Sequence, residues 1–133
     1  MPYSHRIDAQ HGVVLFRGTG VFSSEELRGC LEKVIADPRF ERRFCHLVDL
    51  RDVTLLDATA AEMRERARAD RELEPVIDAP RVALVSSEPS VYGMTRMYEM
   101  LMDDAAPDVR TFKGIGEAVD WLGIPESLAA WND

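Results

Sequence analysis

The sequence has little that would suit it to binding nucleic acid or entering a membrane. The chain of 133 residues carries a formal net charge of −8, whereas nucleic acids and anionic lipids are bound by clustered Lys and Arg. No apolar run approaches the roughly 20 residues that cross a bilayer, and the polar start, MPYSHRIDAQ, does not look like a signal peptide. We therefore expect a cytoplasmic protein with no nucleic-acid partner and no stable membrane insertion.

Cysteine and histidine are scarce, which argues against disulfides and metal sites. Cys30 falls in a helical pattern and Cys45 in a strand pattern, where thiols of a reducing cytosol are usually buried. The three histidines, His5, His11 and His46, lack the spacing of metal ligands. No Ser or Cys stands in a nucleophile elbow. The sequence thus predicts no catalytic residue, no metal and no cofactor, and we expect a protein that is not an enzyme.

What is present is a regular alternation of strand and helix patterns. An antiparallel hairpin is predicted over residues 3–8 and 13–17, followed by a turn at GTG, residues 18–20. A helix is then predicted to begin at the capping box of Ser23 and Glu26. Strands are then predicted at 45–50, 81–87 and 108–112, and helices at 58–73, 89–104 and 114–123. This order predicts an α/β fold with a mixed, mostly parallel sheet.

The stretch VDLRDVTLLDATA, residues 48–60, gathers the carboxylates Asp49, Asp52 and Asp57 where a parallel strand ends, the usual place for ligands in α/β sheets. A phosphate-accepting receiver domain would also need acids after its first strand to hold magnesium. The matching segment here, VVLFRGTG, has none. We therefore interpret Asp52 as part of a turn and Asp57 as lying near a helix start.

The helix over 58–73 carries interleaved Arg and Glu and is interpreted as a solvated face, with Glu62 and Arg66 as an i,i+4 pair. Thr59 with Glu62 fits a second capping box. A phosphate on Thr59 would gain from the helix N-terminus but would meet Asp57 and Glu62, with Arg64 as the only nearby base. We interpret Thr59 as a helix cap first and as a switch second.

The helix over 89–104 shows two apolar stripes. The first accounts for core packing, and the second contains Gly93, Met97 and Met100. Methionine is common at adaptable binding surfaces, so Tyr92, Gly93, Met97 and Met100 form a candidate apolar-ligand or homodimer surface. The alternative is that Met97 packs at the flank of the core and Met100 is simply exposed. Either way, we expect at least one of these two methionines to be exposed or between subunits.

VDLRDVTLLDATA resembles the signature of STAS domains, the anti-sigma-factor antagonists. RVALVSSEPSVYGMTRMYEML followed by VRTFKGIGEAVDWL is similar to the second half of a divergent branch, the SpoIIAA-like proteins. The resemblance covers roughly residues 3–124 and implies a single STAS-like domain over 1–124, with a C-terminal tail over 125–133. It also implies about four helices packed largely on one side of the sheet.

For function, the resemblance implies a non-catalytic binding or regulatory domain that acts through a protein partner. In the antagonists a phosphorylatable Ser follows the Asp of the signature; the matching positions here are Asp57, Ala58 and Thr59, so only Thr59 could accept a phosphate. Asp57, Thr59 and Arg64 are therefore the candidate switch or partner surface. The alternative implied by the same fold group is a carrier or sensor of a small apolar ligand or lipid, with an apolar cavity lined by the third helix.

Overall fold

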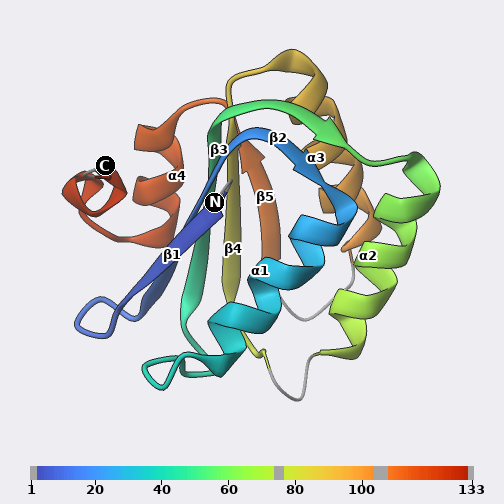
Figure 1. Ribbon diagram of the computed structural model, residues 1–133. Helices are drawn as coiled ribbons and strands as arrows, with labels where there is room; N and C mark the ends of the chain where they lie inside the picture. Colours follow the sequence, from blue (N-terminus) through green and yellow to red (C-terminus); the bar gives the residue numbers. More distant parts are fainter. Residues whose placement is uncertain (1–2, 74–76, 104–107, 132–133) are drawn as a thin grey trace.

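Five strands form one mixed sheet in the order in which they occur along the chain. In the computed structural model, which describes residues 3–73, 77–103 and 108–131, they are β1 (Tyr3–Asp8), β2 (Val13–Ser23), β3 (Cys45–Asp57), β4 (Arg81–Ser86) and β5 (Asp108–Phe112) (Figure 1). Strand β1 runs antiparallel to β2, and β2 to β5 are parallel. The predicted α/β fold with an N-terminal antiparallel hairpin is confirmed.

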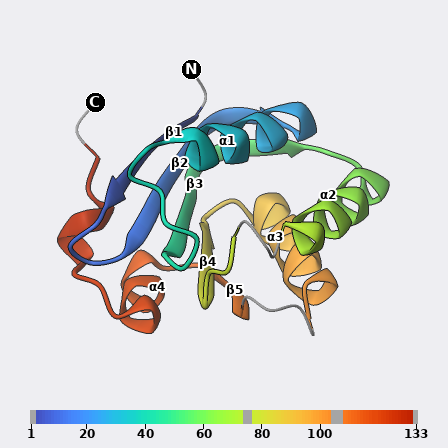
Figure 2. The ribbon, with the colours of Figure 1, turned by 90° about the horizontal axis from the view of Figure 1, so that it is seen from below.

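Helices cover both faces of this sheet. Helices α1 (Ser24–Ala36), α2 (Ala60–Glu72) and α3 (Pro89–Leu101) lie on one face, and α4 (Ile115–Leu122) with the 3₁₀-helix η1 (Glu126–Ala129) lies on the other (Figures 1 and 2). Of the α-helices in the described ranges, three share a face, as the STAS-like resemblance implies. No described helix has both the length and the apolar character needed to cross a membrane.

Strands β2 and β3 continue past the positions where turns were expected. Neither the GTG segment nor Asp52 forms a turn, because both lie inside strands, with Thr19 opposite Asp52. The register shifts on both sides of Thr19, and Gly20 has a φ of 70°, so the glycines allow bulges that keep the ladder going. A Cβ at Gly18 would lie 3.1 Å from Cγ2 of Val53. Of the two glycines that predicted a turn, Gly18 therefore serves the close packing of the strand pair and Gly20 its left-handed backbone conformation.

Both predicted capping boxes are present. Ser23 Oγ accepts from the backbone N–H of Glu26 at 3.2 Å, and Thr59 Oγ1 accepts from that of Glu62 at 3.1 Å, with the reciprocal bonds also formed. Helix α2 consequently begins at residue 60, two residues later than expected. Glu62 also accepts from Ser24 Oγ at 2.6 Å, which joins the N-termini of α1 and α2.

The face under α4 is filled by the protein's own side chains. Val13, Leu15 and Leu47 of the sheet are almost fully buried beneath α4 and η1. The tail contributes to this layer, since Ala129 is buried and the Arg6 guanidinium lies 4.6 Å from the ring centroid of Trp131. The opposite face is packed differently and holds the candidate site.

Candidate ligand-binding pocket

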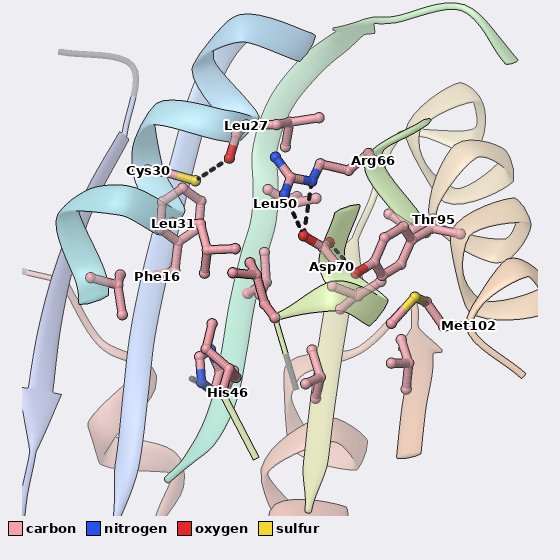
Figure 3. A pocket seen from close by; sticks show the side chains of 18 of the residues that line it. Phe16, Leu27, Cys30, Leu31, His46, Leu50, Arg66, Asp70, Thr95 and Met102 are labelled. Carbon is pink, nitrogen blue, oxygen red and sulfur yellow. Dashed lines mark hydrogen bonds and ion pairs between the residues drawn. The ribbon is translucent and has the colours of Figure 1, made fainter. Parts of the chain in front are cut away.

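A pocket of about 310 Å³ lies between the sheet and the helices α1, α2 and α3 (Figure 3). Its floor is apolar and comes from the strands, with Phe16 of β2, Val48 and Leu50 of β3 and Leu84 of β4. Ligand-binding pockets typically measure about 300–1,000 Å³ and are predominantly apolar with a few polar groups. This pocket lies at the lower end of that range and matches that lining.

The inner face of α1 explains why the pocket is open. Leu27, Cys30 and Leu31 follow the spacing of a core-facing stripe, yet they are only half-buried, and Val34 is the buried residue of the helix. These half-buried side chains line the pocket instead of filling the space above the sheet. The same spacing would be found on a helix packed on a filled core, so the pattern alone did not reveal a pocket.

One end of the pocket carries a polar cluster from α2 and α3. Arg66 Nε donates to Asp70 Oδ1 at 3.0 Å, and the Tyr98 hydroxyl donates to Asp70 Oδ2 at 2.5 Å. Burial, together with the Asp70 charge, raises the pKa of Tyr98 well above its ordinary value, so the phenol stays protonated as a donor. The three groups satisfy one another, and the charges of Arg66 and Asp70 offset each other.

This cluster corrects the interpretation of the Arg-rich helix. Arg66 pairs with Asp70 on the pocket side and is half-buried, whereas a solvated pair of Arg66 with Glu62 was expected. Glu62 is occupied by the cap and by Ser24. The signal was present in the sequence, since Arg66 and Asp70 stand at i,i+4 beside the inward stripe of Met63 and Ala67.

Two further polar side chains of the wall are satisfied within the protein. The Cys30 thiol donates to the carbonyl of Leu27 at 3.1 Å, and burial raises the pKa of Cys30 to about 12, so the reactive thiolate is disfavoured. Thr95 Oγ1 donates to the carbonyl of Tyr92 at 2.9 Å and lies 2.7 Å from the donor Thr111 Oγ1. These groups contribute to the shape of the wall without offering an activated nucleophile.

His46 lies toward a different end of the pocket from the Arg66–Asp70 pair (Figure 3). Strand alternation places its side chain on the same face as Val48 and Leu50. Only 8% of its surface is exposed, and burial lowers its pKa to about 4, so the ring is neutral at pH 7. Within the described part of the chain, its Nε2 has no hydrogen-bond partner. From the sequence, this residue was considered only as a metal ligand and was set aside because its spacing does not fit one.

The candidate surface on α3 lies outside the pocket. Met100 is 62% exposed, which confirms the expectation that Met97 or Met100 would be exposed. Met97 is half-buried and packs against the cluster that includes Val91. Gly93 is exposed, and Tyr92 lies under the Lys113 ammonium at 4.8 Å from the ring centroid. The pocket is lined instead by Thr95 and Tyr98 of α3 and by Met102, which follows the helix directly.

The candidate switch surface is a separate, exposed region. Asp57 ends β3 opposite Ser23, Thr59 caps α2, and Arg64 lies in the second turn of that helix. All three of these candidate residues are exposed, and none lines the pocket. The structure therefore separates the two candidate surfaces from the pocket.

Comparison with known proteins identifies the fold. No family model and no curated protein matches the chain. A crystal structure of an uncharacterised DUF3478-family protein from Shewanella loihica PV-4, described as having a SpoIIAA-like fold, aligns with a TM-score of 0.55. This chain has a SpoIIAA-like fold. The alignment covers 90% of this chain and 93% of the other at 16% identity, so the SpoIIAA-like fold is shared while the function must be argued from the pocket.

Proposed function

We propose that this SpoIIAA-like domain binds a small, mostly apolar molecule in the pocket under α1, α2 and α3, as a carrier or sensor that does not alter it chemically. The observation that carries the proposal is the apolar pocket of about 310 Å³. Removing apolar surface from water contributes roughly 25 cal/mol per Å². A ligand that filled the pocket would therefore gain binding energy from most of its surface.

The contrast between the two faces of the sheet supports the proposal. Under α4, residues such as Ala83, Val85 and Val119 are almost fully buried against one another. Under α1, leucines at core spacing border empty space. Unfilled apolar space weakens a fold because its lining loses packing contacts. An occupant would restore those contacts, so binding should stabilise the folded protein.

The pocket favours ligand binding over the protein-partner hypothesis. The partner surface at Asp57, Thr59 and Arg64 is exposed, and Thr59 already serves as a cap. Neither feature distinguishes a binding surface from an ordinary strand-to-helix connection. Partner binding and a homodimer through Met100 stay predictions.

A direct test uses butylbenzene, an uncharged apolar probe. Native mass spectrometry of the freshly purified protein would first reveal a retained ligand. Added butylbenzene should then shift the amide NMR signals of Val48 and Leu50 while leaving those of α4 unchanged, and should raise the melting temperature.

Two Trp substitutions provide matched variants. Leu31→Trp should occupy part of the pocket and weaken butylbenzene binding, since Leu31 lines it. Leu55→Trp should bind as the native protein does, since Leu55 is 47% exposed and lies outside the pocket. If the native protein shows neither the shifts nor the stabilisation with butylbenzene, the proposed function is wrong.

A further inference from the structure

One nitrogen of the Arg66 guanidinium is left over at the polar end of the pocket. Nε and Nη2 both donate to Asp70 Oδ1, whereas Nη1 has no hydrogen-bond partner among the residues that the structure describes. Across the same residues, the unpaired side-chain atoms that are cut off from solvent belong to Arg6, His46 and Ser86. Nη1 of Arg66 is therefore accessible, and a ligand group can reach it.

The guanidinium of Arg66 faces the pocket. Arg66 is part of the lining, and only 15% of its side chain is exposed. Figure 3 shows the guanidinium reaching from α2 over the strands toward Leu27 and Cys30 of α1. The pKa of Cys30 agrees with this placement, since burial raises it and the charge of Arg66 opposes the rise. A molecule lying on the apolar floor at Val48 and Leu50 would thus meet a cationic donor at this end.

The bonds of Asp70 decide which polar group the cluster offers to a ligand. Asp70 accepts from Arg66 through Oδ1 and from the Tyr98 hydroxyl through Oδ2. Both carboxylate oxygens and the phenol are therefore engaged within the cluster, and Nη1 of Arg66 is the group that remains. Nη1 is a donor, so it calls for an acceptor on the ligand. A hydrogen bond from a charged donor is also stronger than one between neutral groups.

Asp70 makes a second negative charge unfavourable at the same place. A carboxylate that accepted from Arg66 would lie close to the carboxylate of Asp70, and like charges disfavour the charged form. It would also lose its water in a mostly apolar pocket. Arg71, which lines the pocket too, donates to the carbonyls of Leu101 and Asp103 at the end of α3. An uncharged carbonyl oxygen can accept from Nη1 without these costs.

We propose that the pocket takes an uncharged molecule with a mostly apolar body and one carbonyl oxygen, which accepts a hydrogen bond from Nη1 of Arg66, and that Asp70 selects such molecules over carboxylates. The inference rests on the proposed function, because it specifies the ligand of the same pocket. Apolar ketones, esters and amides carry this chemistry. Arg66 binds the polar group of the ligand, and Asp70 determines the specificity by positioning the guanidinium and offsetting its charge.

Three probes with the same number of heavy atoms test this inference. The hydrocarbon 3-methylbutylbenzene, the ketone 4-phenylbutan-2-one and the anion 3-phenylpropanoate share a phenyl ring on a two-carbon chain and differ in the group that ends the chain. Their dissociation constants would be measured with the native protein, with Asp70→Asn and with the double variant Arg66→Met, Asp70→Asn. The native protein should bind the ketone more tightly than the carboxylate.

The variants should change the ratios of these dissociation constants. Asp70→Asn removes the like charge, so the carboxylate should gain on the ketone by about 10-fold or more. The double variant removes the donor together with both charges, so the ketone should lose against the hydrocarbon by about 10-fold or more, the worth of one bond from a charged donor. Glu65→Gln removes one negative charge from the same helix, but Glu65 is 63% exposed and lies outside the pocket. This control should leave both ratios unchanged.

The native protein supplies a readout that does not depend on the folding of any variant. The side-chain ¹⁵Nε signal of Arg66 should move strongly when the ketone is added and little when the hydrocarbon is added. The same signal of Arg68, which pairs with Glu65 outside the pocket, is an internal reference.

The outcomes separate the two proposals. If the hydrocarbon binds but the double variant leaves the ratio of ketone to hydrocarbon unchanged, or if the Arg66 signal does not respond to the ketone, the carbonyl inference is overturned and the proposed function stands. If the native protein prefers the carboxylate, or if Asp70→Asn changes the ratio of carboxylate to ketone no more than Glu65→Gln does, the selecting role of Asp70 is overturned. If none of the three probes binds, both proposals are wrong.

Discussion

Acid should destabilise the protein through His46, and replacing that residue should remove the effect. The unfolded chain takes up a proton at His46 near the ordinary pKa of 6.5, whereas burial lowers the folded-state value to about 4. Between these two pH values the unfolded state binds a proton that the folded state does not. The free energy of unfolding therefore falls as the pH drops through this window.

The size of this effect follows from the two pKa values. The gap between 6.5 and about 4 corresponds to about 3 kcal/mol of stability, present in full above pH 6.5 and lost once the pH reaches 4. His46→Leu has no such group, so its stability relative to the native protein should rise by about 3 kcal/mol on going from pH 7 to pH 4. Leucine also suits the apolar surroundings of residue 46, so the variant should fold.

The assay is urea denaturation followed by circular dichroism at closely spaced pH values. The slope of free energy against urea concentration should be equal in the two proteins, which checks that the same surface unfolds. Arg66, Asp70 and Arg71, the charged residues of the pocket lining, are common to both proteins, so their effects largely cancel. Met63→Leu should run parallel to the native profile. Parallel profiles for His46→Leu and the native protein would refute the argument.

Further substitutions at Tyr98, Thr59, Met97 and Met100 test other parts of the structure. Tyr98→Phe should lower the free energy of unfolding by about 2 kcal/mol, because it removes a donor to the charged Asp70; urea denaturation should show a much smaller loss in an Asp70→Asn background, and equal losses in both backgrounds would contradict the contact. Thr59→Ala should lower the free energy of unfolding by ~1 kcal/mol through loss of the cap, and Thr59→Glu should lower it by about as much without affecting partner binding. If Thr59→Glu instead loses a partner selectively at unchanged stability, the switch hypothesis is restored. Met100→Glu should leave the melting temperature nearly unchanged, since Met100 is 62% exposed, while Met97→Glu should lower it because Met97 packs against the core. If a dimer seen in sedimentation disappears with Met100→Glu, Met100 is a subunit contact. If that variant instead loses much stability, Met100 belongs to the core.

The elements that could be predicted from the sequence are those with local signals. Both capping boxes depend on a hydroxyl and a carboxylate three residues apart, and both are present at Ser23 and Thr59. Continuous apolar runs identified the buried parallel strands β3 and β4. The GTG segment misled because glycine serves turns and bulges equally well, and the choice depends on a neighbour, Val53, which lies far along the chain.

The lining of the pocket could not be predicted from residue patterns, because it depends on the distance between elements. Leu27 and Leu31 have core spacing in either case, and the height of α1 above the sheet decides whether they meet the strands. The burial of His46 and the lack of a described hydrogen-bond partner for its Nε2 could not be predicted either, because both depend on the side chains that surround it in the fold. The family resemblance implied an apolar cavity lined from the third helix. The residues of this segment that line the pocket are Thr95, Tyr98 and Met102, which lie on a different face of the helix from Met97 and Met100.

Polar contacts at the helix ends join α1 to α2 and α2 to the end of α3. Glu62 joins the starts of α1 and α2 by accepting from Ser24 at 2.6 Å and from the backbone of Thr59. At the other end of α2, Arg71 donates to the carbonyls of Leu101 and Asp103.

These contacts act beside the apolar packing of helix residues such as Met63 and Ala67 against the strands. Hydrogen bonds between fixed groups depend on geometry, whereas apolar packing is non-directional and favours closing any gap. Hydrogen bonds thus join the helices both at their ends and, through Tyr98 and Asp70, at the pocket. A molecule in the pocket would contact all three helices, so its binding would be coupled to how they sit relative to one another.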